Sequence, residues 1–562
     1  MATGSMPISS AASSQITASS VQKTAWEGLR ALGSLKITVV MFLAANFLLF
    51  VGTLAQDEKS LPEVKAEYFN CWFAQVPFSD FFPVTVFGES SLTGWFPFPG
   101  GATIGFILLI NLIAAKATRF HIASKGSRLL WGTVVSVVGG LLALLVILTG
   151  HQTDGLQGKP PLAYETVWQL MQIGSAVAAV GLASVALTGK RRRLVRISLA
   201  IAALSAGCAA VGMLFGGESW RMNEPGLRIM WQLMQSSVAS LVMLAGLIMV
   251  FGARGGNVLI HIAVGMLMFG QFAFGDRQIE ERLNLIEGQA SNMVCRTDEI
   301  ELACIEVAEK AAATESVTAI SGRLIKAREG GEAIALEDLP FDIKIVEYFT
   351  NAVVTRVGPF AENRATAGLG TRWLAIARPP EGGASSKSNV AAAYVQLTDR
   401  TNGKDLGVFL VPQFMNDRSQ LFMEAEGDVC DTVDTASGPW RLQLRFRRAY
   451  KPYEVRLDDV RRINYSASET PRDYSSFVTF TDEATGAEQP GRIWMNNPVR
   501  YRGETFFQSN YSKVQLADGS ISEMTGLQVV ENAGWLIPYV ACVLAFWGML
   551  AHFGGTLSLI HI

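Results

Sequence analysis

The sequence is poor in charge and in cysteine. Charged residues make up 17% of its 562 residues and the formal net charge is −2, whereas about a quarter of an ordinary soluble protein is charged. No basic field is present, so we expect no nucleic-acid partner. Six cysteines in 562 residues are too few for a disulfide-rich scaffold, and none of them form a CxxC pair. The spacings of zinc, phosphate-loop and dinucleotide sites are also absent.

Apolar residues are abundant instead and gather in long runs. They account for 49% of the chain, and a membrane-spanning helix needs about 20 of them in succession. Eight runs qualify, and they cover residues 32–55, 99–115, 129–150, 167–188, 194–216, 230–252, 257–274 and 534–553. We therefore predict a polytopic α-helical membrane protein with about eight transmembrane helices.

The segments between these runs alternate in charge. The loop 57–89 is acidic, while the loops 116–128 and 190–193 are basic. Because basic loops stay on the cytoplasmic side of a membrane, we expect these two loops and the tail 1–31 to be cytoplasmic. Residues 276–533 then lie outside, and the protein sits in the inner (cytoplasmic) membrane with its large domain on the periplasmic side.

This orientation divides the chain into consecutive parts. A small, polar tail without enough apolar area to order itself comes first, and a β-rich external domain lies before the last helix. The parts are the disordered cytoplasmic tail 1–31, two helices with an acidic external loop (32–128), repeated hairpins (129–252), the helix 253–275 with His261, the external domain 276–533 and the last helix 534–556.

Residues 276–533 show the alternation of β-strands. Val455, Leu457 and Asp459 fall on one face of such a strand. Asn402-Gly403 predicts a hairpin turn, and we expect a short helix near 301–314.

A five-residue repeat marks two of the helices. Trp-Gln-Leu-Met-Gln occurs at 168–172 and again at 231–235, each time near the outer start of a helix. The tryptophans either anchor the helix at the membrane interface or stack on a planar ligand. Gln169 and Gln172 share a helix face, which favours hydrogen bonds between helices.

Several segments resemble ResB proteins, the cytochrome c biogenesis factors of the System II pathway. The similar segments are 32–56, 339–351 (LPFDIKIVEYFTN), 450–480, 495–511 (MNNPVRYRGETFFQSNY) and 534–550. The resemblance implies a maturation factor that moves or presents haem and apocytochrome c for covalent attachment of haem outside the membrane. Its implied partners are a ResC/CcsA-type haem-handling protein, apocytochrome c and a thiol-disulfide oxidoreductase.

This chain also departs from the family. ResB proteins usually have four spanning helices, so the repeated hairpins of 129–252 look like an insertion. The tryptophan-rich loop of the ResC partner is missing here, which implies a non-catalytic subunit of a haem-lyase complex. Some fused relatives carry a histidine near the end of the second helix, where this chain has Lys116, with His121 slightly beyond.

Histidine is the residue type that suits haem iron, and five are present. His261 lies about one turn inside a spanning helix, where an ionisable group costs about 2.5–3.5 kcal/mol. It is our main haem-ligand candidate, and the alternative is a neutral histidine bonded within the helix bundle. His151 at the outer end of the third helix is either a haem ligand or an interfacial residue. We interpret His121 as solvated and assign His552 no role.

Four cysteines fall in segments expected outside the membrane. Cys71, Cys295, Cys304 and Cys430 could form up to two disulfides, in three connectivities. The alternative is thiol exchange with the cysteines of apocytochrome. The two others, Cys208 and Cys542, lie in helices and read as small apolar residues.

Two other interpretations compete with the maturation factor. The repeated hairpins also suit a transporter, and a large external β domain also suits a membrane sensor that binds a ligand. The last residues, 557–562 (LSLIHI), match a translation of a transposon-end adapter, so we expect them to be a sequencing artefact.

The charge pattern predicts a complete topology. In a variant without native cysteines, a cysteine at Asn402 should react with an impermeant maleimide added to the outside of cells, and one at Lys125 should not. Because the charge rule fixes all the loops together, the reverse labelling pattern would refute the whole orientation.

Overall fold

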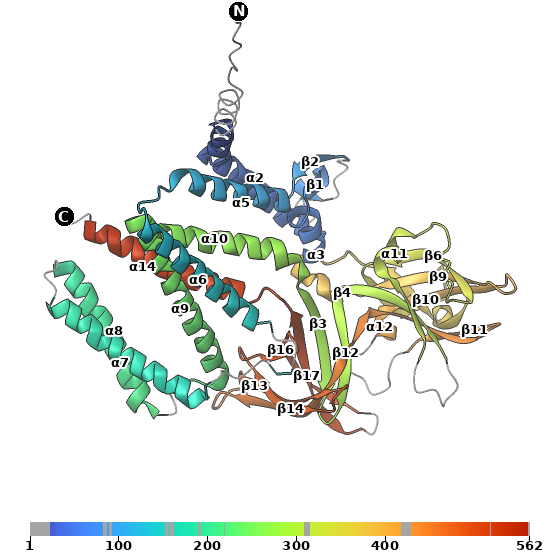
Figure 1. Cartoon of the computed structure of the whole chain (residues 1–562). Coiled ribbons are helices and arrows are strands. Elements are labelled where there is room, and N and C mark those ends of the chain that lie inside the picture. The colour runs from blue at the N-terminus through green and yellow to red at the C-terminus, as the bar shows by residue number, and fades with distance from the viewer. Residues whose placement is uncertain are drawn as a thin grey trace, which may run out of the picture. The chain divides into compact units, whose positions relative to one another are not determined.

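The computed structural model describes residues 23–82, 87–88, 93–151, 155–156, 162–188, 193–217, 220–307, 315–417, 429–516 and 519–559. Of the predicted disordered tail 1–31, residues 1–22 lie outside these ranges, as does most of the basic loop 190–193. The prediction is wrong for residues 23–31, which are helical. The chain forms two compact units, which we describe separately (Figure 1). The first comprises Met1–Ala45, Ala102–Gln278 and Asn532–Ile562, and the second comprises Asn46–Gly101 and Ile279–Glu531.

Long apolar helices dominate the first unit. They are α2 (Leu35–Leu54), α5 (Gly101–Arg119), α6 (Ser127–Thr149), α7 (Tyr164–Thr188), α8 (Arg193–Phe215), α9 (Glu224–Phe251), α10 (Gly255–Phe274) and α14 (Ile537–Leu559). The part of α2 from Asn46 on belongs to the second unit. Seven stretches of the described residues are long and apolar enough to cross a membrane. The predicted polytopic membrane protein is thus confirmed.

One of these stretches contains two helices. Glu224–Phe274 runs for 51 residues, which as one straight helix would be about 75 Å long, more than twice the roughly 30 Å of a bilayer core. The chain breaks at Gly252, whose φ of 61° is costly for other residues. The break separates α9 from α10, and with it the described helices accommodate the eight predicted spans.

Glycines allow the helices of the first unit to pack closely. A Cβ on Gly256 of α10 would lie 2.7 Å from the carbonyl oxygen of Gly548 on α14. A Cβ on Gly139 of α6 would lie 2.4 Å from the backbone nitrogen of Met243 on α9. Small residues at these crossings allow the dispersion contacts that hold helices together in lipid.

A buried amide joins α2 to α5. The side-chain nitrogen of Asn111 donates to the carbonyls of Leu32, at 2.6 Å, and Ser34, at 3.0 Å. Its side-chain oxygen accepts from the hydroxyl of Thr38 at 2.7 Å. Asn111 is therefore satisfied at both ends, as a polar group inside a membrane unit must be.

The repeated pentapeptide packs inside the helix bundle. Trp168 on α7 is buried against Val167 and Leu227, and Trp231 on α9 joins the same cluster. The side-chain amide of Gln172 donates to the carbonyl of Met213 on α8 at 2.8 Å. The predicted hydrogen bond between helices is thus confirmed for Gln172, and Trp168 is held by helix packing.

The second unit is built from β-strands, as predicted. Its largest sheet has ten strands, eight of them in the order β14-β13-β12-β4-β3-β17-β16-β15. These eight are β14 (Glu488–Trp494), β13 (Pro471–Asp482), β12 (Gly438–Asn464), β4 (Ala290–Glu306), β3 (Ile279–Ile286), β17 (Ile521–Glu531), β16 (Glu504–Gln515) and β15 (Val499–Tyr501). The others, β11 (Asp431–Thr435) and β5 (Val317–Ser321), pair with β12 and β4.

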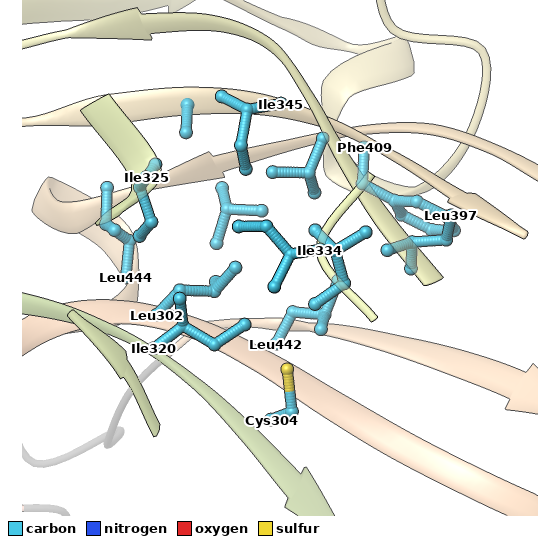
Figure 2. Close-up of a cluster of buried hydrophobic side chains, with 14 of the residues drawn as sticks. Leu302, Cys304, Ile320, Ile325, Ile334, Ile345, Leu397, Phe409, Leu442 and Leu444 are labelled. Carbon is cyan, nitrogen blue, oxygen red and sulfur yellow. The ribbon is translucent and has the colours of Figure 1, made fainter. Parts of the chain in front are cut away.

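A second, three-stranded sheet covers part of the first. It consists of β10 (Asp405–Pro412), β9 (Ala392–Asp399) and β6 (Phe341–Phe349). Figure 2 shows the core between the sheets, where Leu302, Leu442 and Leu397 meet. β7 (Ala352–Arg356) and β8 (Trp373–Ala377) form a small hairpin. The predicted turn at Asn402-Gly403 joins β9 to β10 and is confirmed.

Two local predictions for this unit are wrong. The segment 301–306 belongs to strand β4 and not to a short helix, and 308–314 lies outside the described residues. Val455 and Leu457 are buried as expected, but a β-bulge after Leu457 shifts the register. Val460 and not Asp459 therefore faces the core, because one extra residue reverses the alternation.

The loop after α2 also belongs to the second unit. It contains α3 (Leu61–Val64), β1 (Phe73–Pro77) and β2 (Trp95–Pro99). The backbone nitrogen of Gly383 donates to the carbonyl of Lys59 at 2.9 Å, and Ser60 forms a β-bridge with Gly383. These bonds join two parts of the chain that are more than 300 residues apart in sequence, so the two parts fold as one unit.

A buried ionic cluster ties three strands of the large sheet. The ammonium of Lys451 on β12 lies 2.6 Å from a carboxylate oxygen of Glu281 on β3 and 2.5 Å from one of Glu504 on β16. Tyr453 donates its hydroxyl to Glu504. Burial alone lowers the pKa of Lys451, but its hydrogen bonds to both carboxylates and their charges outweigh burial and raise that pKa.

Lys451→Met should therefore destabilise the second unit strongly. The change leaves two buried carboxylates without their cation, and breaking a buried pair costs about 3–5 kcal/mol. Pulse proteolysis of the full chain across a urea series measures the loss. The control is Lys513→Met, since Lys513 has 63% of its side chain exposed and sits 3.7 Å from Glu523, a pair worth about 0–1 kcal/mol. Equal losses for both variants would contradict a stabilising role for the cluster.

Candidate functional site

His261 lies near the start of α10, inside the first unit. Its Nδ1 is 2.7 Å from the backbone carbonyl oxygen of Asn257, four residues earlier. In the neutral ring, Nδ1–H donates to this carbonyl and Nε2 keeps its lone pair. Nε2 has no hydrogen-bond partner among the residues that the structure describes. A backbone carbonyl on one nitrogen is also how proteins orient a metal-binding histidine.

Three other side chains surround this imidazole. The ring of Phe120 lies edge-on to His261, with 6.4 Å between centroids. The ammonium of Lys116 lies 5.0 Å from the centre of the Phe120 ring. Both Lys116 and His552 are near enough to act on His261 electrostatically. We call His261, His552, Lys116 and Phe120 the His261 cluster.

Helix packing brings the His261 cluster together. α10 and α14 cross where Gly256 meets Gly548, and a Cβ on Gly256 would also lie 2.8 Å from the backbone nitrogen of His552. α5 runs along α10, with Phe106 beside Phe272 near one end and Phe120 beside His261 near the other. Sequence analysis missed His552, although glycines facing each other one turn from a histidine could have indicated it.

The residue types of the His261 cluster are ones that could hold a haem. Neutral imidazole is a strong axial ligand for haem iron, and α10 and α14 each carry one imidazole near their crossing. The ammonium of Lys116 could pair with a propionate, and the Phe120 ring could pack against the porphyrin. The described residues contain no group of three or more His, Cys, Asp or Glu side chains that could hold a bare metal ion.

His151 lies at the opposite end of the helices. It follows Gly150, whose carbonyl accepts a 3.0 Å hydrogen bond from the indole of Trp535, just before α14. His552 is about 15 residues further along α14, roughly 22 Å away along the helix. His151 and His261 therefore cannot bind the same iron. His121 is exposed beyond α5, with its Nδ1 3.2 Å from the carbonyl oxygen of Arg119.

The second unit has an open groove at one end of its large sheet. The groove has a volume of about 510 Å³ and is lined by Val460, Arg461, Arg462, Ile463, Asn464, Tyr511, Lys513 and Glu523. Arg461 also stacks over Phe477 at 4.6 Å, and Tyr511 donates to Glu523 at 2.8 Å. The groove thus combines cations with aromatic rings, a surface that suits a partly acidic peptide.

No disulfide joins any of the six cysteines, so the two disulfides that the sequence allowed do not form. Cys295 and Cys304 are buried on β4, and burial raises the pKa of Cys304 to about 12. Cys71 and Cys430 are partly exposed. The Cys71 thiol donates to the carbonyl of Glu67 at 2.9 Å, and burial also raises its pKa.

Comparison with known proteins identifies one segment of the second unit. Residues 406–522 match the model of the ResB-like family. Protein NrfI of Wolinella succinogenes is 30% identical over 118 residues, which cover 21% of this chain and 12% of NrfI. The match thus spans about an eighth of the relative's length. The family segment contains Lys451, Tyr453 and Glu504 of the ionic cluster and nearly all of the groove.

The cysteine environments predict a labelling pattern. A membrane-permeant maleimide at pH 8 should modify Cys430 and, more slowly, Cys71, because only these two cysteines of the second unit reach the surface. Cys304 should stay unmodified, since at a pKa of about 12 roughly one thiol in ten thousand is ionised at that pH. Mass spectrometry of the native protein, with a urea-denatured sample as the control, measures this. Labelling of native Cys304 as fast as Cys430 would contradict the burial.

Proposed function

Because this chain is a ResB-like, multi-pass membrane protein, we propose that it acts in cytochrome c biogenesis as a System II maturation factor. The family match supports this role, and the eight apolar helices support a place in the inner membrane. The basic loops support an orientation in which the second unit faces the periplasm. Since the match covers 12% of NrfI, this function is a proposal for the chain as a whole.

The observation that carries the proposal is the His261 cluster. Haem is the cargo, and Nε2 of His261 would bind its iron, because Nδ1 is already committed to the Asn257 carbonyl. His552 on the neighbouring helix would be the second protein ligand, and Lys116 would pair with a propionate. The cluster lies at the end of α10 that begins beside Arg254, which the charge rule assigns to the cytoplasm. Haem from the cytoplasm would meet it first.

Covalent attachment of haem to apocytochrome c would also need partner proteins. A ResC/CcsA-type protein would contribute the tryptophan-rich loop where the thioether bonds form, so this chain would be a non-catalytic subunit. The groove beside Arg461 and Tyr511 would contact apocytochrome c on the outer side. A thiol-disulfide oxidoreductase would keep the cysteines of apocytochrome reduced, because the free thiols of this chain include no CxxC pair.

The transporter alternative gains little from the helix packing. Transporters built from repeats use equivalent helix pairs around a central site. Here α7 packs along α8, whereas α9 packs along α6 and α10 along α14. The two copies of the pentapeptide therefore begin hairpins that pack differently. The sensor alternative has only the open groove in its favour.

His261→Ala should lower haem content and the yield of holocytochrome c while protein level stays near normal. We expect a loss of roughly tenfold or more, because even changes to groups behind a metal ligand cost about 10–100-fold in affinity. The measurements are the optical spectrum of the protein purified with its partner and haem staining of cytochromes c. Added imidazole should restore part of both signals.

Two further variants make this experiment specific. His552→Ala should shift the spectrum away from double histidine ligation, whereas His121→Ala is the control and should change nothing. If His261→Ala retains full haem and full cytochrome assembly, then His261 is a packing residue. If His552→Ala retains the original spectrum, the second ligand comes from another protein.

A further inference from the structure

The β1–β2 hairpin in the loop after α2 exposes two large aromatic side chains. Its strands, Phe73–Pro77 and Trp95–Pro99, contain no charged residue. Val76 pairs with Phe96, and Pro77 pairs with Trp95. Ala74 and Val76 are fully buried on one face, whereas the opposite face carries the exposed Gln75 together with Phe73 and Trp95, which are 75% and 54% exposed.

The buried face of the hairpin packs against a membrane-spanning helix. The ring centre of Phe47 on α2 lies 4.7 Å from that of Phe98 and 6.3 Å from that of Phe96. Phe47 comes seven residues before the end of α2 at Leu54, which is about 10 Å along the helix. The hairpin therefore lies beside the last two turns of α2 and not beyond its end.

The hairpin is also tied to the membrane boundary at its end. β2 ends at Pro99, and the spanning helix α5 begins two residues later at Gly101. Phe69 packs between both helices: a Cβ on Gly52 would lie 2.9 Å from its ring, and one on Gly101 would lie 2.3 Å from its carbonyl oxygen. The exposed Phe73 and Trp95 therefore belong to a hairpin that packs against the last turns of α2 and leads directly into α5.

We propose that the β1–β2 hairpin is a membrane-interface element, with Phe73 and Trp95 inserted among the phospholipids of the leaflet where α2 ends. Aromatic rings favour the headgroup level of a bilayer, where the Phe73 and Trp95 rings can leave water while Gln75 on the same face keeps polar partners. The unpaired backbone groups at the edges of a two-stranded sheet cannot be placed in the hydrocarbon core. The headgroup region accepts both the aromatic rings and these polar edges. This inference does not depend on the cytochrome function.

Photo-crosslinking in lipid tests the proposal. p-Benzoylphenylalanine replaces Phe73 in the full-length protein, which is reconstituted in nanodiscs of phosphatidylcholine and phosphatidylglycerol. The matched control places it at Phe360, which is 99% exposed on the second unit. Because Phe73 is largely exposed, the replacement should not affect folding. After irradiation, mass spectrometry should find at least ten times more phospholipid adduct at position 73 than at 360.

Two results would overturn the proposal. Equal lipid adducts at positions 73 and 360 would mean that the hairpin has no special contact with the bilayer. In native membranes, a crosslink from position 73 to a protein, whether a partner or a second copy of this chain, with no lipid adduct would mean that the exposed face is a protein docking surface.

Discussion

The close approach of α10 and α14 at Gly256 and Gly548 is the contact on which the proposed haem chemistry depends. Lipid gives helices no hydrophobic reason to associate, so they must gain dispersion energy by bringing their backbones together. Any side chain at either glycine would push the helices apart. The same contact determines how far His552 lies from His261, because both histidines are within two turns of the crossing. Helix packing and ligand placement are therefore a single constraint in this unit.

The second unit, by contrast, buries charged side chains inside its large sheet, at positions that apolar side chains could have filled. Lys451, Glu281 and Glu504 come from three strands that are distant in sequence. A buried ion pair adds little net stability, but removing one member is costly. Any strand register that separates these three side chains would therefore leave a buried charge without its partner and would be less stable. Lys451 and Glu504 lie within the family segment 406–522, whereas Glu281 lies outside it, so the cluster joins the ResB-like segment to strand β3.

The sequence revealed what depends on local pattern. Apolar runs of bilayer length identified the spanning helices, and Asn402-Gly403 identified a hairpin. What the sequence did not reveal depends on contacts between distant residues. His552 looked like an isolated histidine because only helix packing brings it to His261. The β-bulge after Leu457 adds one residue to the strand, so the inward and outward positions exchange beyond it. Val460 therefore faces the core in place of Asp459. The aromatic hairpin at 73–99 was read only as an acidic loop.

The bond between Gly383 and Lys59 has a consequence for biosynthesis. The two residues are joined across 324 positions of the chain, so at a typical synthesis rate the first waits roughly 15–65 s for the second. Among the described residues, six spanning helices, α5 to α10, lie between them. An even number of crossings leaves both segments in one compartment, whereas the failure of any single helix to insert would leave them on opposite sides. Completion of the second unit therefore depends on an even number of membrane crossings between Lys59 and Gly383.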